Sequence, residues 1–273
     1  MKGLMIAVSA LSVALAACQQ DSSALDSKLE QINQKLAAID QKIGSGQRPG
    51  AAAPSAAPQA RQQRPAPDPG KTYSVPVAGA PYHGPEHAKV TIVKAFEFAC
   101  PFCDRVRPTL DEISKKYGND VKIVYKNLIV HPDVATTPAL ATCAAHKQGK
   151  YEQMQELVWV KGFRAGRNLG QENMEKLAAE VGLDMAKFKA DMAGSCKAVV
   201  EQDQAELRRV GAGGTPAFFI NGRFLSGARP IDQFATIIDE ELKKANDALA
   251  KGAKLETYYD EKVVKQGLKS LAQ

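Results

Sequence analysis

The sequence has few aromatic residues, which make up 6% of its 273 positions, and no long hydrophobic run beyond its N-terminus. A helix that crosses a bilayer needs roughly 20 consecutive apolar residues, so the rest of the chain should contain no membrane-spanning helix. Clusters of Lys or Arg are also missing, although the net charge is +6 and the pI is about 9.0. A site for nucleic acid or anionic lipid needs such a cluster, and neither is expected as a partner.

Residues 1–17 have the features of a bacterial export signal: Lys2 is followed by an apolar run and then by small residues. The sequence Leu-Ala-Ala-Cys at 15–18 resembles a lipobox, in which Cys18 is acylated and becomes the new N-terminus after cleavage. An ordinary secretory signal with an incidental cysteine is the alternative. Gln19 stands where an Asp would favour retention in the inner membrane. The sequence therefore favours a periplasmic protein anchored by lipid alone to the outer membrane.

The five cysteines are an odd number that becomes even once Cys18 is assigned to lipid. Cys100 and Cys103 form a Cys-x-x-Cys pair, whereas Cys143 and Cys196 lie far apart, each in a helical-looking stretch. A zinc site would need a second close pair or nearby His ligands, so we expect no metal. In an oxidising compartment two leftover cysteines seldom stay free. We therefore predict a structural disulfide between Cys143 and Cys196.

Residues 18–43 contain a short heptad pattern that predicts a coiled-coil stalk. Lys occupies each g position, and Asp or Asn occupies each e position, which suits parallel helices. Leu at a with Ile at d favours more than two strands, so we expect a homo-oligomer through residues 25–43, a trimer or tetramer rather than a dimer. The alternative is one amphipathic helix packed on its own domain. The apolar positions are Leu29, Leu36 and Ile43 at a, and Leu25, Ile32 and Ile39 at d.

Residues 44–72 are rich in Ala, Pro, Gln and Gly and have no apolar periodicity, which predicts a disordered linker. A largely polyproline-like segment of this length could span on the order of 80 Å. The folded domain is then expected over residues 73–273.

Apolar periodicity within this domain alternates between strand and helix. The first strand ends directly before the Cys-x-x-Cys pair, so the cysteines should lie at the turn of a strand-helix-strand unit. Asn221-Gly222 between two short apolar runs predicts a hairpin. The expected segments are a strand over Lys89–Phe98, a helix over 103–117, a strand over Val121–Val130, a helical insert over about 134–210, a hairpin over 217–225 and a helix from Pro230 to about Leu249.

Three of these features together resemble the DsbA-like disulfide oxidoreductases over roughly residues 82–250. They are the segment 84–93 before the cysteines, the Cys-Pro-Phe-Cys sequence at 100–103, and Gly-Thr-Pro-Ala-Phe-Phe-Ile-Asn-Gly at 214–222. The resemblance implies an α/β, thioredoxin-like fold with an inserted helical subdomain. It also implies that Pro216 is cis and faces the redox pair. No cofactor is expected.

The chemistry of the pair follows from its place at a helix start. Unpaired N–H groups and the helix dipole favour an anion at Cys100, which makes it the expected nucleophile. Cys103, one turn further, would attack the mixed disulfide and release the substrate. Pro101 fits the first helical turn, where its missing N–H has no intrahelical partner. A cis Pro216 would bring backbone groups of Thr215 beside the sulfurs, where an extended substrate could pair with them.

Three residues near the pair either differ from the pattern of the family or are expected to tune the reactivity of the cysteines. Phe102 stands where the strongest oxidants of the family have a His, so we expect a less oxidising centre, with Phe102 and Pro101 at the substrate surface. Many relatives carry a buried carboxylate where this chain has Lys94. Glu97 is the nearest acid, and two roles stay open for it: taking a proton or pairing with Lys94. Lys94 could also extend outward and never meet a sulfur. None of the four histidines is expected to act as a base.

The sequence thus predicts an enzyme that forms, and also isomerises, disulfides in exported proteins. Its partners would be exported thiol or disulfide proteins and a membrane redox protein, either a quinone-linked oxidase or a reductase. Two alternatives stay open: a catalytically idle client-binding protein, or a thiol metal carrier that uses Cys100 and Cys103. The sequence does not give the direction of electron flow.

Overall fold

The computed structural model describes residues 25–41 and 66–271, and the chain divides into two units, Met1–Arg61 and Gln62–Gln273. Residues 25–41 form a single helix. The expected signal peptide, Cys18 and most of the expected linker lie outside the described residues. No helix in the two described ranges is both long and apolar enough to cross a membrane.

A five-stranded mixed sheet forms the centre of the second unit, with the order β1-β3-β2-β4-β5. Every residue of β2 (Val90–Phe96) is buried, as its apolar sequence predicts. It runs parallel to β3 (Val121–Asn127) and antiparallel to β4 (Ala217–Ile220). The short strands β1 (Tyr82–His83) and β5 (Arg223–Ser226) form the two edges. The turn between β4 and β5 has positive φ at Asn221 and Gly222, which confirms the hairpin.

Alternation along the strands divides the core between the two faces of the sheet. Val90 and Ile92 belong to a cluster with residues of α3 (Arg107–Tyr117) and α9 (Ile231–Ala250). Val93 and Ala95 belong to a second cluster, which includes residues of α8 (Ser195–Arg209), α10 (Leu255–Tyr259) and the π-helical turn Asp260–Val264. The sheet is therefore covered on both sides.

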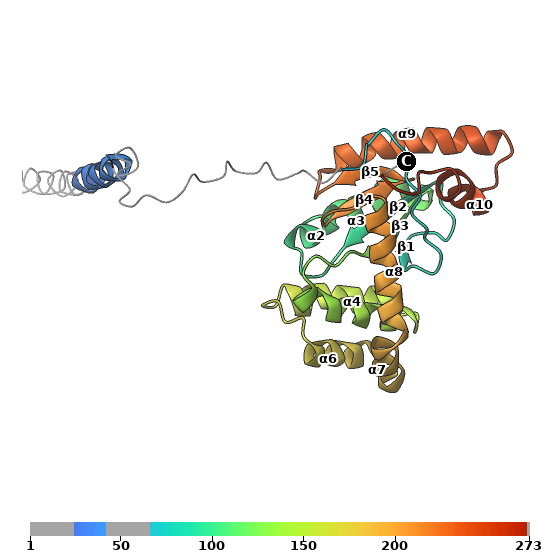
Figure 1. The fold of residues 1–273 in the computed structure, drawn as a ribbon, viewed down its shortest axis with the longest axis horizontal. Helices are drawn as coiled ribbons and strands as arrows, with labels where there is room; N and C mark the ends of the chain where they lie inside the picture. Colours follow the sequence, from blue (N-terminus) through green and yellow to red (C-terminus); the bar gives the residue numbers. More distant parts are fainter. Residues whose placement is uncertain (1–24, 42–65, 272–273) are drawn as a thin grey trace, which may run out of the picture. The chain divides into compact units, whose positions relative to one another are not determined.

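The helical insert lies at one end of the domain, and α8 runs from it back to the sheet (Figure 1). Its core contains Trp159, Met174 and Phe188, all fully buried. This confirms the predicted thioredoxin-like fold with a helical insertion. Its elements are α4 (Pro132–His146), α5 (Tyr151–Leu157), the π-helical turn Val158–Phe163, α6 (Gln171–Val181), α7 (Met185–Ala193) and α8.

Three local features differ from the sequence prediction. The single helix expected over 103–117 is interrupted at Val106, which separates α2 (Pro101–Arg105) from α3. Pro108 explains the break, because it cannot donate the hydrogen bond that a continuous helix would make to Asp104. The strand expected to reach Val130 ends at Asn127. The turns after Lys254 were not predicted.

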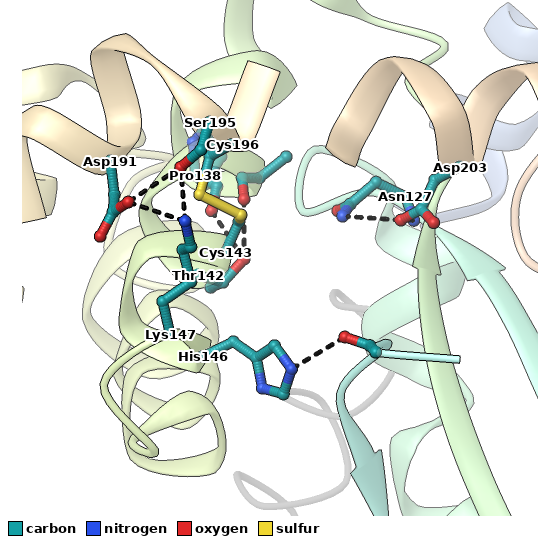
Figure 2. The surroundings of a disulfide bond; sticks show 12 residues. Asn127, Pro138, Thr142, Cys143, His146, Lys147, Asp191, Ser195, Cys196 and Asp203 are labelled. Carbon is teal, nitrogen blue, oxygen red and sulfur yellow. Dashed lines mark hydrogen bonds and ion pairs between the residues drawn. A yellow bond between two sulfur atoms is a disulfide. The ribbon is translucent and has the colours of Figure 1, made fainter. Parts of the chain in front are cut away.

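A disulfide joins Cys143 of α4 to Cys196 of α8, with a Cα–Cα distance of 5.8 Å. Lys147 contacts Asp191 and Ser195 beside it (Figure 2). Cys196 is fully buried and Cys143 is 8% exposed. The predicted structural disulfide is confirmed, and it links the first helix of the insert to the last.

Replacing both Cys143 and Cys196 with Ala should lower the free energy of unfolding by about 4 kcal/mol, because the unfolded chain would regain the entropy of a large open loop. Denaturant titration of the two proteins, with Cys100 and Cys103 kept reduced, measures the difference. Replacing Cys100 and Cys103 with Ala is the matched control and should not cause this loss. Equal stability of the Cys143/Cys196 variant and the wild type would contradict a structural role.

Candidate active site

Cys100 and Cys103 lie where β2 ends and α2 begins. Cys100 is the N-cap residue, and its carbonyl accepts a hydrogen bond from the backbone N–H of Cys103. Pro101 occupies the first turn, as predicted. Neither cysteine forms a disulfide in this structure. Cys100 is 4% exposed and Cys103 is fully buried. The helix start thus places one sulfur at the rim of the protein surface and the other in the core.

The surroundings of Cys100 favour its thiolate. A hydrogen bond from the Cys103 thiol is the largest cause, and it lowers the pKa of Cys100 to about 6 against the opposing effect of burial. Thr215 and the backbone N–H groups of Phe102 and Cys103 lower it further. The two N–H groups belong to the first turn of α2, where backbone donors and the helix dipole favour an anion. A large fraction of Cys100 is therefore a thiolate, the reactive form, at neutral pH.

The surroundings of Cys103 have the opposite effect. Burial is the main cause that raises the pKa of the Cys103 thiol well above its ordinary value, and the hydrogen bond to Cys100 adds to it. The charge of Lys94 opposes this rise. Cys100 is thus the only one of the two that is ready to attack a substrate.

The Thr215–Pro216 peptide bond is cis, as the resemblance implied. The Cys100 thiol lies 3.3 Å from the carbonyl oxygen of Thr215, which can accept its hydrogen bond. Because β4 begins at the next residue, Ala217, the sheet holds this turn against the cysteines. The structure therefore brings Cys100 and Cys103 next to Thr215 and Pro216, which follow more than a hundred residues later in the sequence.

Lys94 points into the protein beneath the redox pair. It is 1% exposed, and its Nζ donates to the carbonyl oxygen of Cys103 at 3.4 Å. The same Nζ lies 5.1 Å from the ring centre of Phe96 and 5.9 Å from those of Tyr125 and Trp159. The alternative that Lys94 extends outward is therefore wrong.

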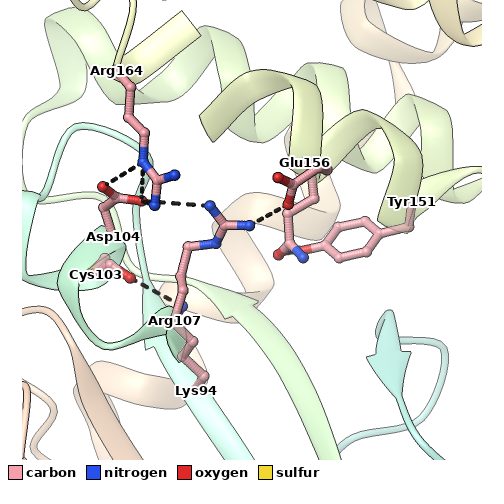
Figure 3. A network of polar contacts seen from close by, with 8 residues as sticks. Lys94, Cys103, Asp104, Arg107, Tyr151, Glu156 and Arg164 are labelled. Atoms are coloured by element: carbon pink, nitrogen blue, oxygen red, sulfur yellow. Dashed lines mark hydrogen bonds and ion pairs between the residues drawn. The ribbon is translucent and has the colours of Figure 1, made fainter. Parts of the chain in front are cut away.

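A polar network ties the active-site helix to the insert above Lys94 (Figure 3). Arg164 of the insert donates to both carboxylate oxygens of Asp104, the residue after Cys103, at 2.8 to 3.1 Å. Arg107 lies 3.5 Å from the same carboxylate and also pairs with Glu156 of α5. The network holds α2 and the insert in one arrangement around the cysteines.

Glu97 has a different partner from the one considered in the sequence. It is fully buried and accepts hydrogen bonds from the backbone N–H groups of Val130 and His131, at 2.7 and 2.9 Å. It also pairs with the His131 side chain, and this raises the pKa of that imidazole. Among the described residues, no ion pair joins Glu97 to Lys94. Glu97 thus fixes the turn between β3 and α4 next to the redox pair.

His131 is the residue near the site that the sequence interpretation missed. A signal was present, because His131 follows β3, and the carboxyl ends of parallel strands meet at the same edge of a sheet. Phe102 is 49% exposed, and Val130 and Val134 are 46% and 49% exposed. The expected place of Phe102 at the surface is correct. Within the described ranges, no group of three His, Cys, Asp or Glu residues could hold a metal ion.

A family model for the DSBA-like thioredoxin domain matches residues 91–239, more than half of the chain. The chain belongs to the DSBA-like thioredoxin domain family. Among solved structures, a thioredoxin-like oxidoreductase from Silicibacter pomeroyi DSS-3 has a TM-score of 0.52 and 26% identity, and covers 64% of this chain and 95% of that one. Oxidised BdbD from Bacillus subtilis has a TM-score of 0.57 and 21% identity, and covers 63% and 98%.

Curated relatives are much longer than this chain. The Na(+)/H(+) antiporter NhaA of Herminiimonas arsenicoxydans is 34% identical over 148 residues, which are 53% of this chain and 23% of the antiporter. The chain thus spans less than a quarter of the length of that relative.

The reactivity of Cys100 toward an alkylating agent should rise with pH through an inflection near 6 and then level off, because only the thiolate reacts. Cys103→Ala removes the largest cause of the low pKa and should move the inflection upward. Cys103→Ser keeps a donor at this position and should move it less. The pH dependence of alkylation in the reduced proteins measures all three. An unmoved inflection in Cys103→Ala would assign the effect to the helix start and Thr215 instead.

Proposed function

We propose that this protein is a thiol-disulfide oxidoreductase that acts on exported proteins in the periplasm. The observation that carries the proposal is the contrast between the two thiols: Cys100 is poised as a thiolate, while Cys103 is a buried thiol one helical turn away. Membership of the DSBA-like family supports the same reaction class. Neither an idle client-binding protein nor a metal carrier accounts for this contrast.

The reaction is thiol-disulfide exchange through a mixed disulfide. When the pair is reduced, the Cys100 thiolate attacks a client disulfide, and Cys103 then attacks Cys100 and releases the client. When the pair is oxidised, a client thiolate attacks Cys100 and Cys103 leaves. The carbonyl of Thr215 beside Cys100 offers an edge to an extended client segment. The exposed apolar side chains Phe102 and Val130 suit an unfolded client surface.

The N-terminal sequence supports the location and the anchor. The export signal over 1–17 and Cys18 in its lipobox favour a lipid-anchored protein, and Gln19 favours the outer membrane. A membrane redox protein, an oxidase or a reductase, would reset the pair after each reaction. The direction in which it does so decides whether the chain makes or removes disulfides in the cell.

Exchange with a disulfide-bonded peptide tests the reaction. The wild type should form and resolve a mixed disulfide, Cys100→Ser should lose exchange, and Cys103→Ser should accumulate the mixed disulfide because its resolving thiol is missing. Acid quenching followed by mass measurement separates these species. Catalysis that persists in Cys100→Ser would refute the proposed nucleophile. If the wild-type protein binds the peptide without any exchange, the result would support the idle client-binding alternative instead.

We further propose that the helix over 25–41 joins several copies and that this assembly allows disulfide isomerisation. The apolar side chains Leu25, Leu29, Ile32, Leu36 and Ile39 are between 52% and 65% exposed. Their heptad spacing suits burial against identical helices. Lipid anchors confine the copies to one membrane face, and this raises their effective concentration. Several redox sites around one stalk could engage one misfolded client together.

Deleting residues 19–43 should give a monomer that still oxidises thiols but no longer refolds a client with scrambled disulfides. Sedimentation at tens of micromolar and a refolding assay compare this form with the intact chain. Replacing Leu29 and Leu36 with Ser keeps the length of the stalk and is the matched control for its spacing role; it should also abolish assembly. If the intact chain sediments as a monomer, or if the deletion variant isomerises disulfides equally well, the stalk would act only as a spacer.

A further inference from the structure

Lys94 is a buried cation without a carboxylate partner in the described part of the chain. The comparison with Lys126 of the neighbouring strand is informative, because the Lys126 side chain is 5% exposed and pairs with both Asp203 and Glu206. A buried charge is costly unless it is paired, so the arrangement around Lys126 is the ordinary one. Lys94 has instead one hydrogen bond, to the carbonyl of Cys103, and three aromatic rings around its Nζ.

The charged groups that face Lys94 come from the elements packed on its side of the sheet. Asp104 is already engaged by Arg164 and Arg107, and Arg107 repels the ammonium. The thiolate of Cys103 is the strongest favourable charge that Lys94 can meet. The titratable or charged groups nearest to Lys94 are Cys100, Cys103, Asp104, Arg107 and Tyr125. The pocket that Lys94 lines also holds His83, Asp111, Glu152 and Glu156.

A pocket of about 280 Å³ connects Lys94 to the exposed side of the domain. Lys94 lines it together with Trp159 and Tyr125, and exposed residues such as Glu152 and Glu156 line it as well. The pocket is large enough for several water molecules. A proton on Lys94 can therefore reach solvent without passing the client at Cys100.

We propose that Lys94 exchanges a proton with Cys103 whenever the disulfide between Cys100 and Cys103 forms or breaks. This inference rests on the proposed function and adds a residue for its second step. A buried sulfur must change its charge during that step, and Lys94 is the neighbouring group that can compensate the change. The Nζ of Lys94 contacts the backbone of Cys103 and feels the charge of its sulfur, so in this proposal the proton passes directly or through one water.

The step balances in both directions. To resolve a mixed disulfide, neutral Lys94 takes the proton of the Cys103 thiol, and the resulting thiolate attacks the sulfur of Cys100. A bond forms between the two enzyme sulfurs, the bond from Cys100 to the client breaks, and the client leaves with the electron pair as a thiolate. In the reverse reaction a client thiolate attacks Cys100, Cys103 leaves as a thiolate, and the ammonium of Lys94 returns the proton.

The acid-base properties of Lys94 suit this exchange. Burial is the main cause that lowers the pKa of Lys94 to about 8, against the favourable charge of Cys103. About one molecule in ten then has a neutral Lys94 at pH 7, whereas an exposed lysine would be almost wholly charged. Below this pKa the ammonium can donate to a leaving Cys103, and above it the amine can accept. Resolution should therefore become faster as the pH rises toward 8.

The test measures the two steps separately in the full-length protein mixed with a disulfide-bonded peptide and quenched with acid. Lys94→Met removes both the proton site and the charge, and Lys94→Arg keeps the charge but cannot release a proton at these pH values. Both should form the mixed disulfide normally and resolve it about 10²-fold more slowly at pH 7, the lower range for a positioned acid or base. Both should also lose the inflection near pH 8.

Lys122→Met is the matched control, because Lys122 is a partly buried lysine of the neighbouring strand. It pairs in register with Thr91 and thus lies on the opposite face of the sheet from Lys94. It should leave both steps unchanged. Wild-type resolution should also show a solvent isotope effect in D₂O, which requires no substitution.

Three results would overturn the inference: normal resolution in Lys94→Met, normal resolution in Lys94→Arg, which would reduce Lys94 to a fixed charge, or no isotope effect. A wild type without any exchange would instead refute the proposed function itself.

Discussion

The start of helix α2 places two identical thiols in opposite surroundings, and the remainder of the domain maintains that difference. At Cys100 the first turn of the helix directs backbone donors toward the sulfur, and the turn that contains Pro216 lies beside it. One turn later Cys103 is enclosed by the sheet and by the aromatic core of the insert. The helical insert is therefore part of the redox site itself. It helps to bury Cys103, which keeps the second thiol protonated, and the Asp104 network holds the insert in place.

Much of the fold follows from local patterns in the sequence. The largely apolar character of β2 and the Asn221-Gly222 turn depend on neighbouring residues only, so their assignment needs no tertiary information. The edge strand β1 and the turns after Lys254 could not be predicted in this way. They are short, and distant contacts hold them, such as the hydrogen bond between the backbone of Ser74 and the carbonyl of Leu268.

The same distinction between local patterns and distant contacts applies to the site. The roles of Cys100 and Cys103 could be predicted because the chemistry depends on their spacing and on the helix that follows. The partnership of Glu97 with His131 joins positions that are 34 residues apart, and no periodicity connects them. The direction of the Lys94 side chain could not be predicted either, because a lysine in a strand can face either way until the packing of the insert is known.

The disulfide between Cys143 and Cys196 means that this chain depends on correct disulfide formation for its own folding. Four cysteines can pair in three ways, and only one pairing leaves Cys100 and Cys103 available to each other. A newly made chain must therefore join Cys143 to Cys196 without trapping Cys100 or Cys103 in another pairing. After folding, Cys103 and Cys196 are fully buried, and Cys100 and Cys143 are each less than a tenth exposed, so exposure does not distinguish the two pairs. The helix start instead stabilises the reduced form of the redox pair through the Cys100 thiolate, whereas the bond between Cys143 and Cys196 closes the folded insert. The folded domain can therefore keep one pair open and the other closed under the same redox conditions.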